Sequence, residues 1–409
     1  MRLVGPSTAI VPGIAAPTAS LELWYYAQII YAVMGAALGL STGYIGVAAL
    51  SVLALLCFVQ CSRRPLAVLM PVALVTAFGV SHILVQMVVF REALMGEMLR
   101  PMISWMLNLL IIQCLALRRG FLHRSAIATF VIGLCTVPFM VTNFAGSNGR
   151  VGLSSGISIG NPNSLAAWFG FCCVYFVVMA LESRRMWIRV LSTVAATGSL
   201  YVVALTVSRG ALFGVALAML IAFRRVLKRG FVPLLVLVAF AWIAAGLGLF
   251  ERSASLYLER GLEESGRFAV WPAVLGRILD HPLTGVGGAA ILTTVPGIGS
   301  TITPHNQFLF VALASGVVPF AFFMAYWIRL GIGIARLNAI AHPDAVFFFP
   351  LFVYTLMIGV DLDQPFMVSW VMSTLGSLGA AVFVLDAGRA IESSRTQGTV
   401  HPRLVVAPR

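Results

Sequence analysis

The sequence predicts an all-α, polytopic membrane protein with about 12 transmembrane helices. Of its 409 residues, 60% are hydrophobic and only 10% are charged, and the mean hydropathy is +0.97. Such a composition excludes an ordinary soluble globular domain. The apolar runs are continuous and lack the strict alternation of outer-membrane barrel strands. In lipid, continuous runs satisfy their backbone hydrogen bonds only as helices.

Twelve apolar blocks can be drawn along the chain. Each is roughly 16–25 residues long, which suits a helix that crosses about 30 Å of hydrocarbon. A lead-in over 1–23 precedes this transmembrane domain of 24–386, and a cytoplasmic tail over 387–409 follows it. The expected spans are 24–40, 44–60, 66–90, 101–117, 125–142, 161–182, 190–207, 208–223, 231–250, 306–328, 346–360 and 365–386.

Basic residues cluster in every second connection between these spans, as the positive-inside rule requires. The sequence therefore predicts cytoplasmic N- and C-termini. The net charge of +13 is explained by this bias and gives no support to a nucleic-acid partner. The clusters are Arg63 and Arg64; Arg118, Arg119 and Arg124; Arg184, Arg185 and Arg189; Arg224, Arg225, Lys228 and Arg229; and Arg329 and Arg336.

Two outward connections are long, residues 143–160 and residues 251–305. Long loops in compact proteins are usually functional or disordered. The second loop contains the segment "GRFAVWPAVLGRILDHPLTGVGG" (266–288), whose apolar residues recur at helical spacing. We expect an amphipathic helix on the outer membrane surface between the ninth and tenth spans, followed by a Gly-rich turn at 285–288. Its apolar positions are Phe268, Trp271, Val274, Leu275 and Ile278.

Arg209 stands between two apolar blocks with almost no loop, in "TVSRGALFG". The block that follows it, 208–223, is only about 24 Å long at 1.5 Å per residue, so its outer end should lie in a recess. Ser208 is expected to cap the helix, and Gly210 would let a ligand approach the backbone. A phosphate would suit this place. An arginine that snorkels to the lipid headgroups is the alternative.

Further candidates occur in the long loop and beside the later spans. Arg267, at the start of the expected surface helix, offers a forked guanidinium for phosphate oxygens; a solvated surface charge is the alternative. His305 could take a proton from a sugar hydroxyl, or it could be an interfacial, hydrogen-bonded histidine. Asn306 and Gln307 could orient it or a sugar. Asp361 and Asp363 follow the eleventh span. They could orient the histidine or hold a sugar, and they could equally be ordinary acidic residues of the loop that leaves the span.

The predicted topology places all of these candidates on the same, outer side. Two cations and a base there would suit an anionic lipid-linked donor and a hydroxyl acceptor. We expect no metal or other cofactor at this site, so arginines would have to stabilise a leaving diphosphate.

Four segments resemble the O-antigen ligase and polysaccharide polymerase superfamily, in the family's order, over roughly residues 155–370. They are "GNPNSLAAW" (160–168), "SRG" (208–210), the 266–288 segment quoted above and "HNQFLFVALASG" (305–316). The resemblance implies a bundle like that of C-type glycosyltransferases in the bacterial inner membrane, with a periplasmic active site. It also implies transfer of a glycan from undecaprenyl diphosphate to an acceptor glycan or glycolipid, without metal or nucleotide sugar.

The resemblance also implies roles for individual residues. His305 would be the base for the acceptor hydroxyl, and Arg209 and Arg267 would bind the diphosphate. A flippase and a chain-length regulator would be partners. The expected supporting or substrate-binding residues are Asn306, Gln307, Asn163, Asp361 and Asp363.

Two transferase functions remain open within this superfamily, and one function outside it. Pro319 departs from the family pattern after Gly316, which favours a polymerase of exopolysaccharide or O-antigen repeat units over a ligase that joins the chain to lipid A-core. A secondary transporter or lipid flippase would require ionisable residues in mid-span and related halves, and the sequence has almost none of the former.

Overall fold

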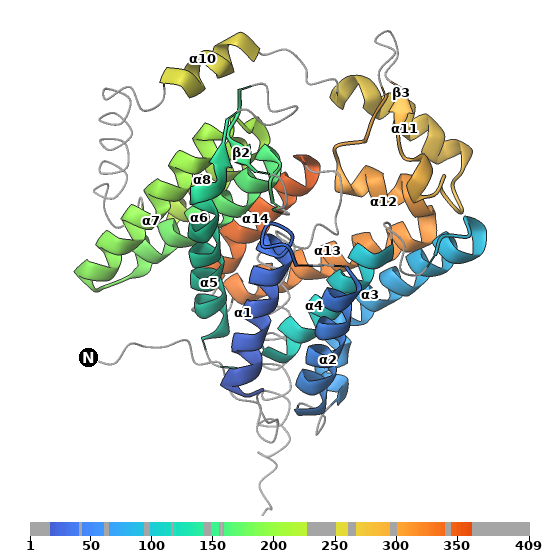
Figure 1. Ribbon diagram of the computed structural model, residues 1–409, viewed down its shortest axis with the longest axis horizontal. Coiled ribbons are helices and arrows are strands. Elements are labelled where there is room, and N and C mark those ends of the chain that lie inside the picture. Colours follow the sequence, from blue (N-terminus) through green and yellow to red (C-terminus); the bar gives the residue numbers. More distant parts are fainter. Residues whose placement is uncertain are drawn as a thin grey trace, which may run out of the picture.

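The structure is a computed structural model dominated by helices (Figure 1). Two expected spans, 231–250 and 365–386, lie outside its described residues, as does most of the lead-in and all of the tail. The described residues are 17–40, 43–60, 65–93, 99–115, 118, 120–142, 149–154, 157, 159–226, 251–260, 267–294, 301–339 and 345–361.

The described helices follow the expected spans closely through the first eight blocks. The third helix continues as a short π-helix, η1 (Val85–Val89). The helices are α1 (Ala19–Met34), α2 (Tyr44–Gln60), α3 (Pro65–Leu84), α4 (Leu99–Leu115), α5 (Phe121–Thr136), α6 (Pro162–Glu182), α7 (Met186–Leu205), α8 (Arg209–Val226), α10 (Glu251–Arg260), α11 (Arg267–Asp280), α12 (Gln307–Ser315), α13 (Val317–Ala339) and α14 (Ala345–Asp361).

Four described helical segments are long and apolar enough to cross a membrane, and four shorter apolar helices accompany them. The chain is thus a helical membrane protein, and the count of 12 spans stays a prediction. The four segments are Phe121–Phe139, Pro162–Glu182, Met186–Leu205 and Val317–Ala335.

Helix α6 is the centre of the bundle. Its apolar stretch is 89% buried, against 28% for the neighbouring α7. Helix α14 packs against α6 and α8 (Figure 1). The hydroxyl of Tyr354 on α14 donates to the Ala167 carbonyl at 2.9 Å. Gly170 leaves room for that ring, because a Cβ there would lie 2.7 Å from Tyr354 Cζ. The motif at 160–168 therefore begins a core helix.

The predicted continuous span over 306–328 is wrong. The helix α12 ends at Ser315, Gly316 has φ +76°, and α13 begins at Val317. The break is tertiary in origin: the Val317 amide donates to the Pro282 carbonyl at 2.8 Å. A Cβ on Gly316 would lie 2.7 Å from Thr284 N. The chain 282–288 thus packs into the joint between the two helices.

The long loop contains more structure than the sequence predicts. Helix α11 occupies part of the expected amphipathic segment and packs on α12, and Val270 and Val274 are its fully buried residues. Leu275 is 49% exposed, so it does not belong to the buried face. Helix α10 was not expected. Both lie across one end of the bundle (Figure 1), and their place at a membrane surface stays a prediction.

The fold is not strictly all-α, because two short antiparallel strand pairs lie in the loops. The strands β1 (Met140–Val141) and β2 (Gly152–Leu153) pair in the first long connection. In the second, β3 (Thr293–Thr294) pairs with β4 (Thr301–Ile302) directly before the HNQ segment.

A buried carboxylate ties helices together at the opposite end of the bundle. Glu22 on α1 is 2% exposed and forms ion pairs with Arg118 and, at 2.7 Å, with Arg124. At the same end, the Thr18 amide donates to Gln60 Oε1 at 3.0 Å. Residues 18, 22, 60, 118 and 124 therefore share one end, as alternating spans require. That this end is cytoplasmic stays a prediction.

Candidate functional site

His305 is held in a strained turn between β4 and α12. It has φ +45°, which is uncommon for a residue with a side chain. The preceding carbonyl, that of Pro304, accepts a hydrogen bond from Trp271 Nε1 on α11 at 2.9 Å. His305 is half-buried. The loop helix therefore fixes the backbone beside the predicted base, and strained backbone of this kind is frequent at functional sites.

Asn306 is the N-cap of α12. Its Oδ1 accepts hydrogen bonds from the amides of Phe308 at 2.9 Å and Leu309 at 3.2 Å. These bonds satisfy two of the otherwise unpaired amides at the helix start. The asparagine thereby sets the direction in which α12 leaves His305, and any contact of Asn306 with the histidine ring or a sugar stays a prediction.

Gln307 is a buried amide on the face of α12 that meets α14. It is 1% exposed, and neither its Nε2 nor its Oε1 has a hydrogen-bond partner among the described residues. Gly359 on α14 makes the space for it, because a Cβ there would lie 2.7 Å from Gln307 Cδ. Burial of an amide without partners is costly, and the expected role of Gln307 in binding substrate stays a prediction.

Arg209 is the first residue of α8 and is half-buried. The expected cap by Ser208 is not formed: its Oγ is buried and has no hydrogen-bond partner in the described part of the chain. Ser208 contributes to the helix through its backbone carbonyl, which accepts a hydrogen bond from the Leu212 amide at 3.1 Å. Val207 has φ +51°, so α7 turns into α8 through a tight, strained junction that presents Arg209 at a helix N-terminus.

Arg150 was missed by sequence reasoning. Its Nε donates to the Thr206 carbonyl at 2.6 Å, and its Nη2 donates to Asn163 Oδ1 at 2.6 Å. Asn163 lies in the first turn of α6, where Asn161 is the N-cap. A lone arginine in a loop gives no sequence signal of its own. The structure shows that it joins the GNPN motif to the turn before Arg209.

The site residues thus form two groups. Arg150, Asn163 and Arg209 lie at the junction of α6, α7 and α8, whereas His305 and Gln307 lie at the start of α12. Helix α14 contacts α6, α8 and α12 (Figure 1), so it connects the two groups. The Arg267 and Asp361 side chains and the whole of Asp363 lie outside what the structure describes. Convergence of the arginines with His305 remains a prediction.

Comparison with known families decides the assignment. Residues 194–324 match the family model of the O-antigen ligase domain. This segment, about a third of the chain, thus resembles an O-antigen ligase domain. This match supports the resemblance to the superfamily, and three of the four sequence segments lie within it, whereas "GNPNSLAAW" (160–168) lies outside. A search of curated proteins found no match to the chain.

The matched segment runs from α7 into α13 and contains Arg209, Arg267, His305, Asn306 and Gln307. Asn163, Asp361, Asp363 and the newly found Arg150 lie outside it. The O-antigen ligase assignment supports glycan transfer of the ligase or polymerase type in a membrane. It says nothing about the role of any single residue.

Gln86 is a second residue that the sequence did not reveal, and it supports the O-antigen ligase domain from outside. It lies in η1 and is fully buried. Its Nε2 donates to the Ala314 carbonyl at 2.8 Å, and its Oε1 accepts from the Gly288 amide at 3.0 Å. Gln86 thus fastens the Gly-rich turn to the end of α12. In the sequence, the one indication that Gln86 is important is that it is a polar residue within an apolar span.

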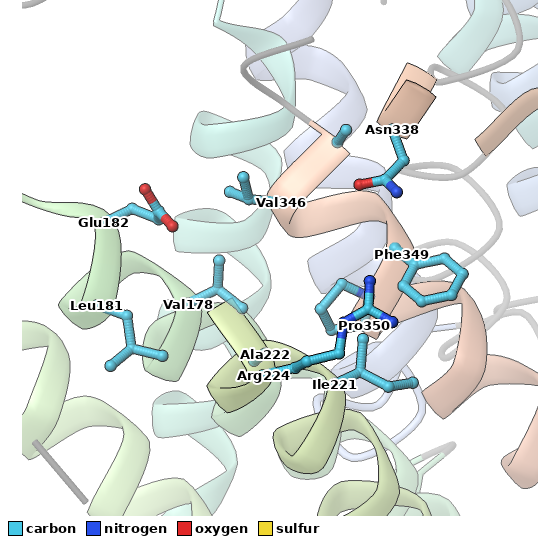
Figure 2. A pocket seen from close by; sticks show the side chains of 11 residues that line it. Val178, Leu181, Glu182, Ile221, Ala222, Arg224, Asn338, Val346, Phe349 and Pro350 are labelled. Carbon is cyan, nitrogen blue, oxygen red and sulfur yellow. The ribbon is translucent and has the colours of Figure 1, made fainter. Parts of the chain in front are cut away.

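A small pocket lies at the other end of the helices that carry the candidate transfer site. Figure 2 shows Glu182 and Arg224 on opposite sides of it, with apolar side chains between them. Arg224 is about 22 Å along α8 from Arg209 at 1.5 Å per residue, and Glu182 ends α6, which begins beside Asn163. This pocket is therefore separate from the candidate transfer site.

Proposed function

We propose that this chain transfers an undecaprenyl-diphosphate-linked oligo- or polysaccharide to an acceptor sugar hydroxyl at the periplasmic face of the bacterial inner membrane. One observation carries the proposal: the O-antigen ligase match spans Arg209, Arg267 and His305. Two features of the fold support it. Arg209 begins helix α8, and His305 is fixed beside a capped helix start and a buried amide that has no hydrogen-bond partner among the described residues.

The chemistry is an inverting displacement that requires one base and one anion-stabilising group. The imidazole of His305 accepts the proton of the acceptor hydroxyl while the oxygen forms a bond to the anomeric carbon. The bond from that carbon to the diphosphate oxygen breaks, and undecaprenyl diphosphate leaves with the electron pair. Arg209 and Arg267 stabilise the charge that develops on it. Because the leaving group is already good, positioning carries much of the remaining work.

A histidine variant with a matched control tests the proposal. We expect purified His305→Ala protein to lose at least about 100-fold in glycan transfer, the usual contribution of a general base. His281 is an exposed histidine in the same loop, so His281→Ala should transfer at the wild-type rate. Correct insertion of both variants is checked by detergent extraction and size-exclusion profile. Normal transfer by His305→Ala would refute the assignment of the base.

Polymerisation of repeat units is our first choice of reaction, and ligation to lipid A-core is the second. The departure from the family pattern at Pro319 favours the polymerase. Pro319 is a weak argument, however, since it lies in the first turn of α13, where proline is tolerated for structural reasons. The family's description favours the ligase. A glycan gel of a deletion strain separates them: loss of a polymerase leaves single repeats, and loss of a ligase leaves full-length chains off the core.

A further inference from the structure

Arg150 closes the carboxyl end of α7. The helix ends at Leu205, and the last carbonyls of a helix have no partner within it. Two of them are satisfied from the segment before β2: the Val151 amide donates to the Leu205 carbonyl at 3.2 Å, and Arg150 Nε donates to the Thr206 carbonyl at 2.6 Å. A guanidinium is well suited to this place, because the carboxyl end of a helix is its negative end.

The turn that Arg150 holds is short and strained. Only Thr206, Val207 and Ser208 separate α7 from α8, and Val207 is a β-branched residue at φ +51°. Such a conformation persists only where surrounding contacts enforce it. The bond from Arg150 acts on the residue directly before Val207.

The second arm of the guanidinium connects this turn to α6. Arg150 Nη2 donates to Asn163 Oδ1 at 2.6 Å, and Asn163 belongs to the first turn of α6, the most buried of the four described candidate spans. A forked, planar group can hold two acceptors in fixed directions, which lysine cannot do. Arg150 therefore fixes the position of the start of α8 relative to α6, a rigid element.

We propose that Arg150 is a positioning residue for Arg209: it holds the 206–208 turn against α6, so that the Arg209 guanidinium is already oriented for the diphosphate of the lipid-linked donor. This inference rests on the proposed function. Arg150 acts through the turn, by its bonds to the Thr206 carbonyl and to Asn163. Its loss would leave the bundle folded but would let the start of α8 move.

Binding of undecaprenyl diphosphate to the purified full-length protein in detergent tests this role. We expect Arg150→Gln to raise the Kd about tenfold with unchanged stoichiometry, because the diphosphate then has to order Arg209. Arg150→Lys, which keeps the charge but lacks the planar fork that holds both acceptors, should lie between this variant and the wild type. Asn163→Ala, which leaves the bond to Thr206 in place, should give a smaller increase and serves as the second variant if Arg150→Gln does not fold.

Arg118 provides the matched control. It is an arginine held by side-chain bonds at the opposite end of the bundle, so Arg118→Gln should lower the melting temperature without changing the Kd. If Arg150 had a purely structural role, Arg150→Gln would behave like Arg118→Gln: fewer molecules would be able to bind, and these would bind with the wild-type Kd. That result would overturn the inference.

The controls also separate this inference from the proposed function. If the wild type binds undecaprenyl diphosphate and Arg209→Gln weakens binding while Arg150→Gln does not, only the role of Arg150 is wrong. If the wild type does not bind undecaprenyl diphosphate at all, the proposed donor is wrong, and the positioning role falls with it.

Discussion

Gln307 on α12 occupies the space that Gly359 leaves open on α14, with its amide buried and without a hydrogen-bond partner among the described residues. We predict that Gly359→Ala impairs glycan transfer as Gln307→Ala does. The added methyl would overlap the Gln307 amide, which can rotate away at a cost of about 1–3 kcal/mol. Transfer rate and melting temperature of the purified variants, measured together, check this.

Gly198→Ala is the matched control, because Gly198 is a helical glycine with nothing near its missing Cβ. It should leave transfer unchanged and raise stability slightly through helix propensity. Wild-type transfer by Gly359→Ala would show that the position of the Gln307 amide is unimportant.

The joint between α12 and α13 depends on two glycines that face each other across it. Gly316 and Gly285 have φ of +76° and +67°, and a Cβ on Gly285 would lie 2.7 Å from Ser315 N. The atoms that a Cβ would meet belong to the backbone, so they cannot move aside as the end of a flexible side chain could. We predict that Gly316→Ala and Gly285→Ala each lower the free energy of unfolding by about 3 kcal/mol, seen as a reduced melting temperature.

The two changes should not add, because both disturb the same contact. Gly276→Ala in α11, a glycine with open space around it, should be harmless. Additive losses would mean that the two glycines act at separate places.

The sequence revealed the helices where one long apolar block makes one helix. Hydrophobic periodicity and length locate α2, α6 and α7 within a few residues, because the membrane imposes that length. The block over 306–328 was wrongly predicted to be one helix, because its apolar character continues through Gly316. The break at Gly316 is caused by contacts with the 282–288 segment, which is distant in the sequence. Long-range contacts of this kind leave no local pattern.

The residues of the candidate site likewise divide into those that the sequence indicates and those that only long-range contacts reveal. Arg209 and His305 were found because a charged or titratable residue at a helix mouth is conspicuous in an apolar sequence. Arg150 and Gln86 were not, since their importance lies in bonds to the backbone of Thr206, Gly288 and Ala314. Only the folded chain brings those carbonyls and amides to them.

Gln86 should control the local stability of the Gly-rich turn. Gln86→Leu removes one donor to the Ala314 carbonyl, which keeps its bond from the Gly287 amide at 3.2 Å. It also leaves the buried Gly288 amide without its acceptor, and an unpaired buried group of this kind costs about 1–3 kcal/mol. We predict faster hydrogen exchange at residues 285–288, because the bonds of this turn open more often. Hydrogen-exchange mass spectrometry of the detergent-solubilised protein measures it.

Gln60 offers the control, since it bonds a backbone amide at the other end of the bundle. Gln60→Leu should leave exchange at 285–288 as in the wild type. Equal exchange in Gln86→Leu and the wild type would mean that the bonds from Val286 and Gly287 to α12 suffice to hold the turn.

Glu22 is predicted to matter for stability and not for chemistry. Its buried carboxylate pairs with Arg118 and Arg124 and accepts from the Tyr26 hydroxyl at 2.7 Å. Glu22→Gln leaves two guanidiniums without their counter-charge. Fully buried pairs lose 3–5 kcal/mol when one partner is removed. Both arginines are partly exposed, at 22% and 43%, so water offsets part of this and we expect about 2 kcal/mol.

The variant should therefore melt at a lower temperature and accumulate less in membranes, whereas glycan transfer per folded molecule stays at the wild-type rate. Normalising activity to the monodisperse fraction on size exclusion separates the two effects. Glu22→Asp, which keeps the charge on a shorter side chain, should recover part of the stability. A fall in transfer per folded molecule would instead mean that this end of the bundle is coupled to the site at Arg209 and His305.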